Sequence, residues 1–255
     1  MFAKPAANSM TAPATAAPTT AMILAAGLGT RLRPITDGMP KPLVRIRGRA
    51  LLDHAIDRLV AAGVETIVVN THYRSEQIIA HLATRRTPHI VISEERDLLE
   101  TGGGVHKALP LLGESFYVVN ADIFWLDGKV PALARLTRAW RDAETDAMLL
   151  LQRTTTAVGY DGHGDYFLDP LGVPQRRGES QIAPLLFAGV QLLHHRLFAG
   201  IEALPTKFPL TLLYDRTQES GRLRGIIHDG EWYHIGTPAG LAAAEDRLVV
   251  TRVER

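Results

Sequence analysis

The sequence predicts an α/β fold, with a Rossmann-like, doubly wound, mainly parallel sheet and a smaller, irregular substrate-facing part. Three observations predict it. From residue 21 onwards, short apolar runs alternate with amphipathic helical stretches, which is the pattern of βαβ units. The first apolar run leads directly into a glycine-rich turn. After residue 152, glycines and polar residues become frequent and the alternation stops.

In the N-terminal half, each expected strand is a short apolar run, and each expected helix repeats apolar residues three and four positions apart. Leu52, Ile56 and Leu59 show this helical repeat, and Gly63 ends it. In chain order we predict a strand at 22–25, a helix at 51–62, a strand at 66–70, a helix at 76–82, a strand at 89–93, a loop holding Gly102, Gly103 and Gly104 before a short helix, a strand at 116–120, a helix at 131–141 and a strand at 147–151.

The C-terminal half has fewer regular patterns. Residues 154–184 carry five glycines among polar residues, which indicates loops and short antiparallel strands. Residues 185–193 are apolar enough to form another central strand. A hairpin-like pair at 223–227 and 232–235 and a helix at 238–250 complete the prediction.

Composition divides the chain into a tail and a domain. The 255 residues are 46% hydrophobic and 22% charged, which is ordinary for a globular protein. Residues 2–20 are instead rich in Ala, Pro and Thr, and prolines interrupt every apolar segment there. We predict a disordered tail over residues 1–20 and a single domain over residues 21–255.

Three bulk properties restrict the classes of function. A formal net charge of +1 predicts no binding to nucleic acid or to an anionic membrane surface. No apolar run reaches the roughly 20 residues that would span a bilayer. The absence of cysteine excludes disulfides and thiolate metal sites, and it suits a reducing compartment, so we expect a cytoplasmic protein.

A glycine-rich segment follows the first strand, at the edge where open α/β sheets bind ligands. Glycines let backbone N–H groups approach a phosphate closely, and Arg31 adds a planar cation that can bind the phosphate oxygens. Glycines alone are also typical of a tight turn, but Arg31 and Pro34 at fixed offsets favour phosphate binding. Leu32 stands where a dinucleotide fingerprint needs glycine, and the chain has no Gly-Lys-Ser/Thr. We predict nucleotide binding by Leu24, Ala25, Ala26, Gly27, Leu28, Gly29, Thr30 and Arg31.

Two charged side chains are candidates for chemistry on the phosphates. Pro40 and Pro42 flank Lys41, so we expect Lys41 on a stiff extended segment, where its ammonium neutralises a phosphoryl group under attack. Asp122 follows the strand at 116–120 and reaches the same sheet edge, where a carboxylate is a natural Mg²⁺ ligand. The alternative interpretations are a surface lysine and a helix-capping aspartate.

Three consecutive glycines are a second unusual feature, because they cost conformational entropy. Bare backbone at a helix N-terminus can receive a base or a sugar at close range. A flexible loop is the alternative interpretation. The candidate nucleotide contacts here are Glu100, Thr101, Gly102 and Gly103.

In this order, the segments resemble the sugar-1-phosphate nucleotidyltransferase family. Its members share L-A-A-G-x-G-T-R-L-x-P, then P-K-P, a glycine-rich stretch and an aspartate after a central strand, and the resemblance runs from residue 21 to residue 247. It implies the nucleotidyltransferase type A form of the fold, and an NTP and a sugar 1-phosphate as partners. It also implies catalysis by Arg31, Lys41 and Asp122, with Mg²⁺ (or Mn²⁺) bound at Asp122. The residues that would bind the sugar phosphate are Asn120, Gly164, Asp165, Ala188 and Gly189.

Within the family, residues 100–112 most resemble members that join UTP to N-acetylmuramate 1-phosphate in cell-wall recycling. Enzymes of the mannose-1-phosphate guanylyltransferase type, and others acting on glucose 1-phosphate or phosphocholine, are alternatives. A nucleotide-binding regulatory protein without catalytic activity is another. Because family members range from monomers to tetramers, the resemblance predicts no oligomeric state.

The chain departs from the family pattern at one position. Members typically carry W-x-D-[IV]-G-T near the C-terminus, with the aspartate as the second metal ligand, and His234 stands at that position here. Mg²⁺ prefers oxygen ligands, whereas imidazole suits Mn²⁺, Co²⁺ or Zn²⁺. Three outcomes follow: Asp122 and the phosphates hold Mg²⁺ without His234, His234 changes the metal preference, or the activity is weakened.

Overall fold

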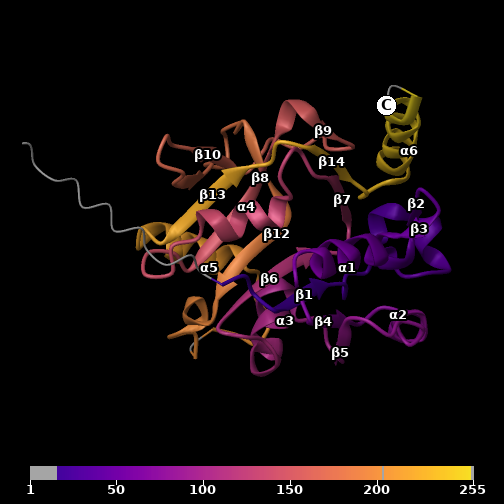
Figure 1. Cartoon of the computed structure of the whole chain (residues 1–255), viewed down its shortest axis with the longest axis horizontal. Coiled ribbons are helices and arrows are strands. Elements are labelled where there is room, and N and C mark those ends of the chain that lie inside the picture. The colour runs from indigo at the N-terminus through magenta and orange to yellow at the C-terminus, as the bar shows by residue number, and fades with distance from the viewer. Residues whose placement is uncertain (1–15, 203, 254–255) are drawn as a thin grey trace, which may run out of the picture.

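The computed structural model describes residues 16–202 and 204–253, which Figure 1 shows in colour. Most of the tail predicted for residues 1–20 lies outside the described residues. Thr20 begins the first strand, β1 (Thr20–Leu24), two residues before the predicted start. The carbonyl of Thr19 accepts hydrogen bonds from the N–H groups of Glu65 and Thr66, so the sheet already includes this part of the chain.

A nine-stranded sheet forms the centre of the described structure. Besides β1 it contains β4 (Thr66–Thr71), β5 (His89–Glu94), β6 (Ser115–Asn120), β8 (Ala147–Arg153), β10 (Tyr166–Leu168), β11 (Pro174–Arg176), β12 (Leu185–His194) and β13 (Leu223–Ile227). The order is β11-β10-β12-β6-β1-β4-β5, with β8 and β13 continuing from β12. The pairings make β11 and β12 run against the other seven strands, so the prediction of a mainly parallel sheet is confirmed.

Helices cover both faces of this sheet. They are α1 (Leu51–Ala61), α2 (Ser75–Leu82), α3 (Glu100–Ala108), α4 (Ala132–Ala139) and α5 (Thr211–Glu219), whereas α6 (Pro238–Val253) packs in a separate core that includes Ile46 and Tyr233. Successive residues of a strand point to opposite faces. Ile23 packs in the core that includes buried side chains of α1 and α4, whereas Met22 packs in the core that includes those of α3 and α5. The sheet is therefore doubly wound, as predicted.

The strand register brings three chain segments together at one sheet edge. Leu24, the last residue of β1, pairs with Asn70 of β4 and with Asn120 of β6. Parallel strands end at the same edge, so the segments that follow these three residues meet there. This is the edge at which open α/β folds bind ligands.

A second sheet has three strands, β7 (Ile123–Leu126), β14 (Glu231–His234) and β9 (Ala157–Val158). The predicted hairpin at 223–227 and 232–235 is wrong, because β13 pairs with β8 whereas β14 pairs with β7 and β9. The chain changes sheets at Gly230, where a Cβ would lie 2.0 Å from the carbonyl oxygen of Leu126. Sequence patterns showed the two strands but not their partners.

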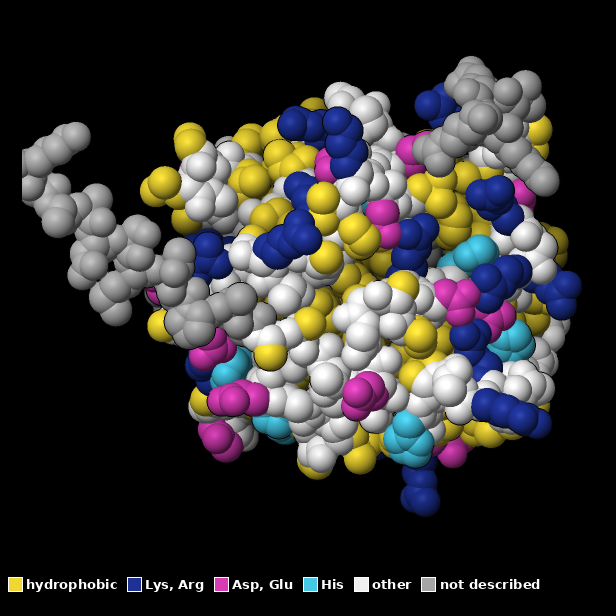
Figure 2. Space-filling model, in the orientation of Figure 1, with side chains coloured by type: hydrophobic (Ala, Val, Ile, Leu, Met, Phe, Trp, Pro, Cys, Tyr) yellow, Lys and Arg dark blue, Asp and Glu magenta, His cyan; other side chains and the backbone are white. Residues whose placement is uncertain are grey.

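The β2–β3 hairpin, formed by β2 (Arg45–Ile46) and β3 (Arg49–Ala50), lies next to α6 in Figure 1. Figure 2 shows Lys and Arg side chains interspersed with Asp and Glu over the visible face, without a large field of one sign. None of the helices described is long and apolar enough to cross a membrane.

The three glycines predicted to lie in a loop are inside α3. A Cβ on Gly102 would lie 2.4 Å from ring atoms of Phe208, and one on Gly103 would lie 2.2 Å from the carbonyl oxygen of Thr206. The glycines therefore let α3 pack directly against the backbone of residues 206–208. Tertiary packing, rather than loop flexibility, explains their presence.

Candidate active site

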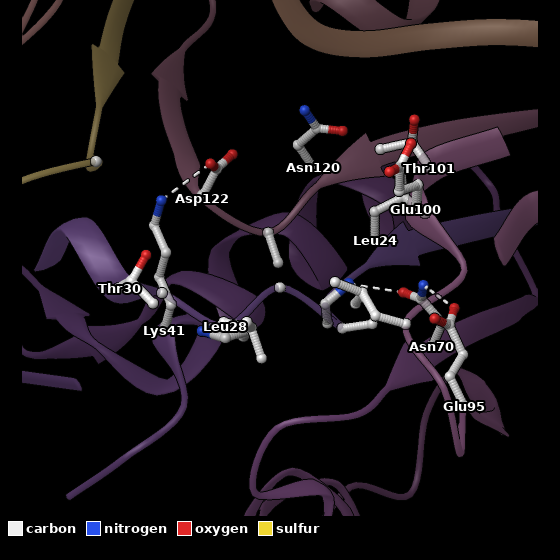
Figure 3. Close-up of a pocket in the computed structure, with 18 of the residues that line it drawn as sticks. Leu24, Leu28, Thr30, Lys41, Asn70, Glu95, Glu100, Thr101, Asn120 and Asp122 are labelled. Atoms are coloured by element: carbon white, nitrogen blue, oxygen red, sulfur yellow. Dashed lines mark hydrogen bonds and ion pairs between the residues drawn. The ribbon is translucent and has the colours of Figure 1, made fainter. Parts of the chain in front are cut away.

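A cavity of about 520 Å³ opens at the carboxyl ends of β1, β4 and β6. The whole predicted nucleotide segment, residues 24–31, lines it. Lys41, Asn120 and Asp122 also line it, and Figure 3 shows Lys41 and Asp122 pointing toward each other. The structure therefore brings the main residues of the predicted catalytic and nucleotide sites into one place.

Gly29 is held in a conformation that only glycine adopts readily. Its φ is 67°, and a Cβ there would lie 3.2 Å from the Cβ of Lys41 and 3.2 Å from Cγ2 of Thr36. The hydroxyl of Thr36 donates to the carbonyl of Gly29 at 2.8 Å. The turn at Gly29 therefore packs directly against Lys41, which ties the glycine-rich segment to the lysine.

Lys41 begins a 3₁₀ turn (Lys41–Leu43), so the prediction that it lies on an extended segment is wrong. Pro40 is extended, but the N–H of Val44 donates to the carbonyl of Lys41 at 3.0 Å and closes the turn. Pro42 is compatible with the start of a helical turn, because its missing N–H is not needed there. The turn points the Lys41 side chain, only 11% exposed, into the cavity.

Lys41 and Asp122 form an ion pair, with 2.9 Å between Nζ and Oδ2. Burial raises the pKa of the Asp122 carboxyl, but the charge of Lys41 and its hydrogen bond lower it by more, so the pKa lies below its ordinary value. Asp122 is therefore ionised at neutral pH. One carboxylate edge is bonded to Lys41, and the exposed Arg31 lines the same cavity.

Asn70 and Glu95 line the other end of the cavity, and the sequence analysis missed both. Asn70 accepts a hydrogen bond from the N–H of Ala25 at 2.7 Å and donates to Glu95 Oε1 at 2.7 Å, as Figure 3 shows. Both side chains are 3% exposed. A Cβ on Gly104 would lie 2.8 Å from Glu95 Oε1, which explains this glycine. Asn70 ends the strand predicted at 66–70, as Asn120 ends the one predicted at 116–120, so the rule that singled out Asn120 would also have found Asn70.

Glu100 and Thr101 line the cavity, but Gly102 and Gly103 do not. The N–H groups of the two glycines donate to the carbonyl of Phe208 at 2.8 and 3.1 Å, so they are already bonded within the protein. The hydroxyl of Thr101 accepts from the N–H of Leu210 at 2.9 Å. The start of α3 is therefore attached to the segment before α5.

His234 lies beside Asp122 on the neighbouring strand, since it pairs with Ile123 and the N–H of Ile235 donates to the carbonyl of Asp122. Its ring stacks on Trp232 at 6.1 Å between centroids. Burial lowers the pKa of His234 and outweighs the opposing effect of the Asp122 charge, so the imidazole is neutral at neutral pH. No group of three or more His, Cys, Asp or Glu suited to a metal occurs among the side chains that the structure describes.

A second cavity has a volume of about 370 Å³ and is lined by one of the remaining predicted residues. Asp165 lines it, and its Oδ2 accepts from the N–H of Phe187 at 2.8 Å. Gly164, Ala188 and Gly189 line neither cavity. A Cβ on Gly189 would lie 3.2 Å from the Cβ of Asn120, and the carbonyl of Ala188 accepts from the indole N–H of Trp232.

The chain is similar in sequence to known nucleotidyltransferases. A model of the MobA-like NTP transferase domain matches residues 21–207. An N-acetylmuramate alpha-1-phosphate uridylyltransferase of Caulobacter vibrioides is 44% identical over 238 residues, which are 91% of this chain and 98% of the relative. The enzyme of the same name from Neisseria meningitidis serogroup B is 32% identical, over 88% of this chain and 96% of the relative.

The fold is similar to that of solved nucleotidyltransferases. A UDP-glucose pyrophosphorylase crystallised with UDP-glucose superposes with a TM-score of 0.75 over 92% of this chain and 100% of that chain. The sequence identity is only 17%, so this likeness concerns the fold alone.

Proposed function

Because the chain belongs to the MobA-like NTP transferase family, we propose that it joins UTP to N-acetylmuramate 1-phosphate and releases a UDP-sugar and pyrophosphate. At the coarser level, the chain is a sugar-1-phosphate nucleotidyltransferase, as are relatives of nearly the same length. The observation that carries the proposal is the first cavity, in which the glycine-rich segment faces the Lys41–Asp122 pair.

The nucleotide binds along residues 24–31. The turn at Gly29 presents backbone N–H groups and Arg31 presents a guanidinium to the triphosphate. The base and ribose lie toward Glu100 and Thr101, at the end of the cavity where the Asn70 side chain holds the N–H of Ala25. The buried Asn70 thus positions the backbone on which the nucleotide rests.

The reaction is an in-line displacement at the α-phosphorus. A phosphate oxygen of the sugar 1-phosphate bonds to that phosphorus while its bond to the bridging oxygen of the β-phosphate breaks, and pyrophosphate leaves with the electron pair. The attacking oxygen is already an anion, so no general base is needed. Lys41 and Arg31 stabilise the charge that develops on the α-phosphate. Lys41 is fixed by Asp122 before substrate binds, which reduces the reorganisation needed for catalysis.

Members of this family generally use a divalent metal ion. Asp122 fits such an ion, because it is an ionised carboxylate at the cavity wall and carboxylate oxygen is the ligand that Mg²⁺ prefers. We propose that Asp122 holds Mg²⁺, or Mn²⁺, together with phosphate oxygens of the nucleotide. The ion would add charge neutralisation at the phosphates. The neutral imidazole of His234 is the second candidate ligand and favours Mn²⁺.

The sugar phosphate extends from Asn120 toward the second cavity. Asn120 lines the first cavity and contacts the bulge at Gly189, and Asp165 lines the second. Gly164 approaches the backbone so closely that a Cβ there would lie 2.1 Å from the carbonyl oxygen of Ala183. We propose that the sugar lies along these residues.

Pyrophosphate release tests the proposal directly. The purified chain is assayed with each of four NTPs, with N-acetylmuramate, N-acetylglucosamine, mannose and glucose 1-phosphates and with phosphocholine, in Mg²⁺ or Mn²⁺. We expect the highest kcat/KM with UTP and N-acetylmuramate 1-phosphate. A best activity with GTP and mannose 1-phosphate would identify the enzyme as a guanylyltransferase instead. Binding of NTP without pyrophosphate release in any combination would identify a regulatory protein.

A further inference from the structure

The second cavity contains an arginine that the proposed mechanism does not use. Arg177 lines this cavity, follows β11 and is half-buried. Its Nε donates to the carbonyl of Gly164 at 2.7 Å, and its Nη1 donates to the carbonyls of Gly178, Glu179 and Gln181 at 3.0, 3.1 and 3.3 Å. Backbone carbonyls thus hold the guanidinium in place on two of its three nitrogens.

The third nitrogen, Nη2, has no hydrogen-bond partner in residues 16–202 and 204–253, and within those ranges no carboxylate forms an ion pair with Arg177. The neighbouring Arg176, which lines the same cavity, is different, because Asp215 forms an ion pair with it. A guanidinium that backbone carbonyls hold at a cavity wall, with one nitrogen unbonded, is suited to donate to an anionic group of a ligand.

A short series of contacts links the second cavity to Asp122, beside the proposed position of the reacting phosphates. Gly164, whose carbonyl holds Arg177, donates its N–H to the hydroxyl of Tyr160 at 3.0 Å, and the Tyr160 ring lies 6.4 Å from His234, which neighbours Asp122. On the other side, Pro209 lines the first cavity and Thr211 lines the second. The two cavities are therefore neighbours along residues 209–211.

We propose that Arg177 binds a carboxylate carried by the sugar of the substrate and so selects an acidic sugar 1-phosphate over its neutral counterpart. The inference rests on the proposed function, since N-acetylmuramate is N-acetylglucosamine with a lactyl ether that ends in a carboxylate. Arg177 presents the N–H of Nη2 to this carboxylate. Asp165 and Glu179 also line the cavity, and their negative charges repel an anion. A bound carboxylate is therefore accepted only where it reaches Arg177.

The test compares kcat/KM for N-acetylmuramate 1-phosphate and N-acetylglucosamine 1-phosphate, with UTP, in wild type, Arg177→Gln and Arg177→Lys. The ratio of the two values is the readout, because distortion of the loop would lower both substrates together. Loss of one charge-assisted hydrogen bond predicts a fall in the ratio of about 10- to 100-fold in Arg177→Gln. Arg177→Lys keeps the charge and should recover part of the ratio. Arg86→Gln, at an exposed position that lines neither cavity, is the control and should leave the ratio unchanged.

The outcomes separate the two claims. If wild type prefers the acidic sugar and Arg177→Gln keeps that preference, the role of Arg177 is overturned and the proposed function stands. An equal loss with both substrates would assign Arg177 to loop structure alone and also overturn the inference. If wild type releases pyrophosphate only with neutral sugars, the proposed substrate itself is refuted.

Discussion

Replacing Lys41 by Met tests the centre of the site, because Met keeps most of the side-chain volume and removes the charge. Lys41 is the partner of Asp122 at 2.9 Å and is only 11% exposed. Removing a preorganised charge from a developing phosphate charge costs about 100- to 1,000-fold in kcat. We therefore expect kcat for pyrophosphate release to fall by about this factor. Lys129→Met, at an exposed position, is the control and should keep wild-type kcat.

The same variant has a predicted effect on stability. Exposed ion pairs contribute up to about 1 kcal/mol, whereas breaking a buried pair costs about 3–5 kcal/mol. Asp122 is 33% exposed, so the solvent screens part of its charge, and we expect a loss of about 1–3 kcal/mol in the free energy of unfolding at pH 7.

The sign of the pH dependence follows from the lowered pKa of Asp122. A carboxyl with a lowered folded pKa contributes stability that is present above its unfolded pKa, about 3.9, and is lost as the pH falls through the folded value. The difference between wild type and Lys41→Met should therefore shrink as the pH falls from 7 through 4 toward 3. Urea unfolding at each pH measures it. A difference independent of pH would refute the ion-pair explanation, and a near-normal kcat would remove Lys41 from the mechanism.

Three further variants test other parts of the site. Gly103→Ala places a Cβ 2.2 Å from the Thr206 carbonyl oxygen and should lower the free energy of unfolding by about 1–3 kcal/mol. The control Gly38→Ala has open space around its Cβ and should change this free energy little. Equal effects of the two variants in urea unfolding would contradict this prediction. Asn70→Ala leaves the N–H of Ala25 unbonded and should raise the KM for NTP along with a loss of about 1–3 kcal/mol; an unchanged KM would show that Asn70 does not position the nucleotide segment. His234→Asp should raise the activity ratio of Mg²⁺ to Mn²⁺, and an unchanged ratio would exclude His234 as a metal ligand.

Sequence alone determined the features that depend on local pattern. The alternation of apolar runs and amphipathic stretches predicted the doubly wound sheet, and the carboxyl-end rule placed the glycine-rich segment, Asn120 and Asp122 at one edge. The register of Leu24 with Asn70 and Asn120 places these segments together. Lys41 lines the cavity at this edge, although its backbone forms a turn rather than the predicted extended segment.

Only the tertiary structure decided what depends on contacts between distant segments. Gly102 and Gly103 fit because residues 206–208 pack against them, and Gly104 fits because Glu95 does, and no local property of residues 102–104 reveals these neighbours. The strands β13 and β14 were visible as apolar runs. Their assignment to different sheets depends on their partners, because β13 pairs with β8 whereas β14 pairs with β7 and β9. Arg177 has no local motif, and its place at the cavity wall depends on its hydrogen bond to the carbonyl of Gly164, thirteen residues away in the chain. Periodicity specifies which face of an element is buried, whereas the partner it buries against is selected by the packing of the whole chain.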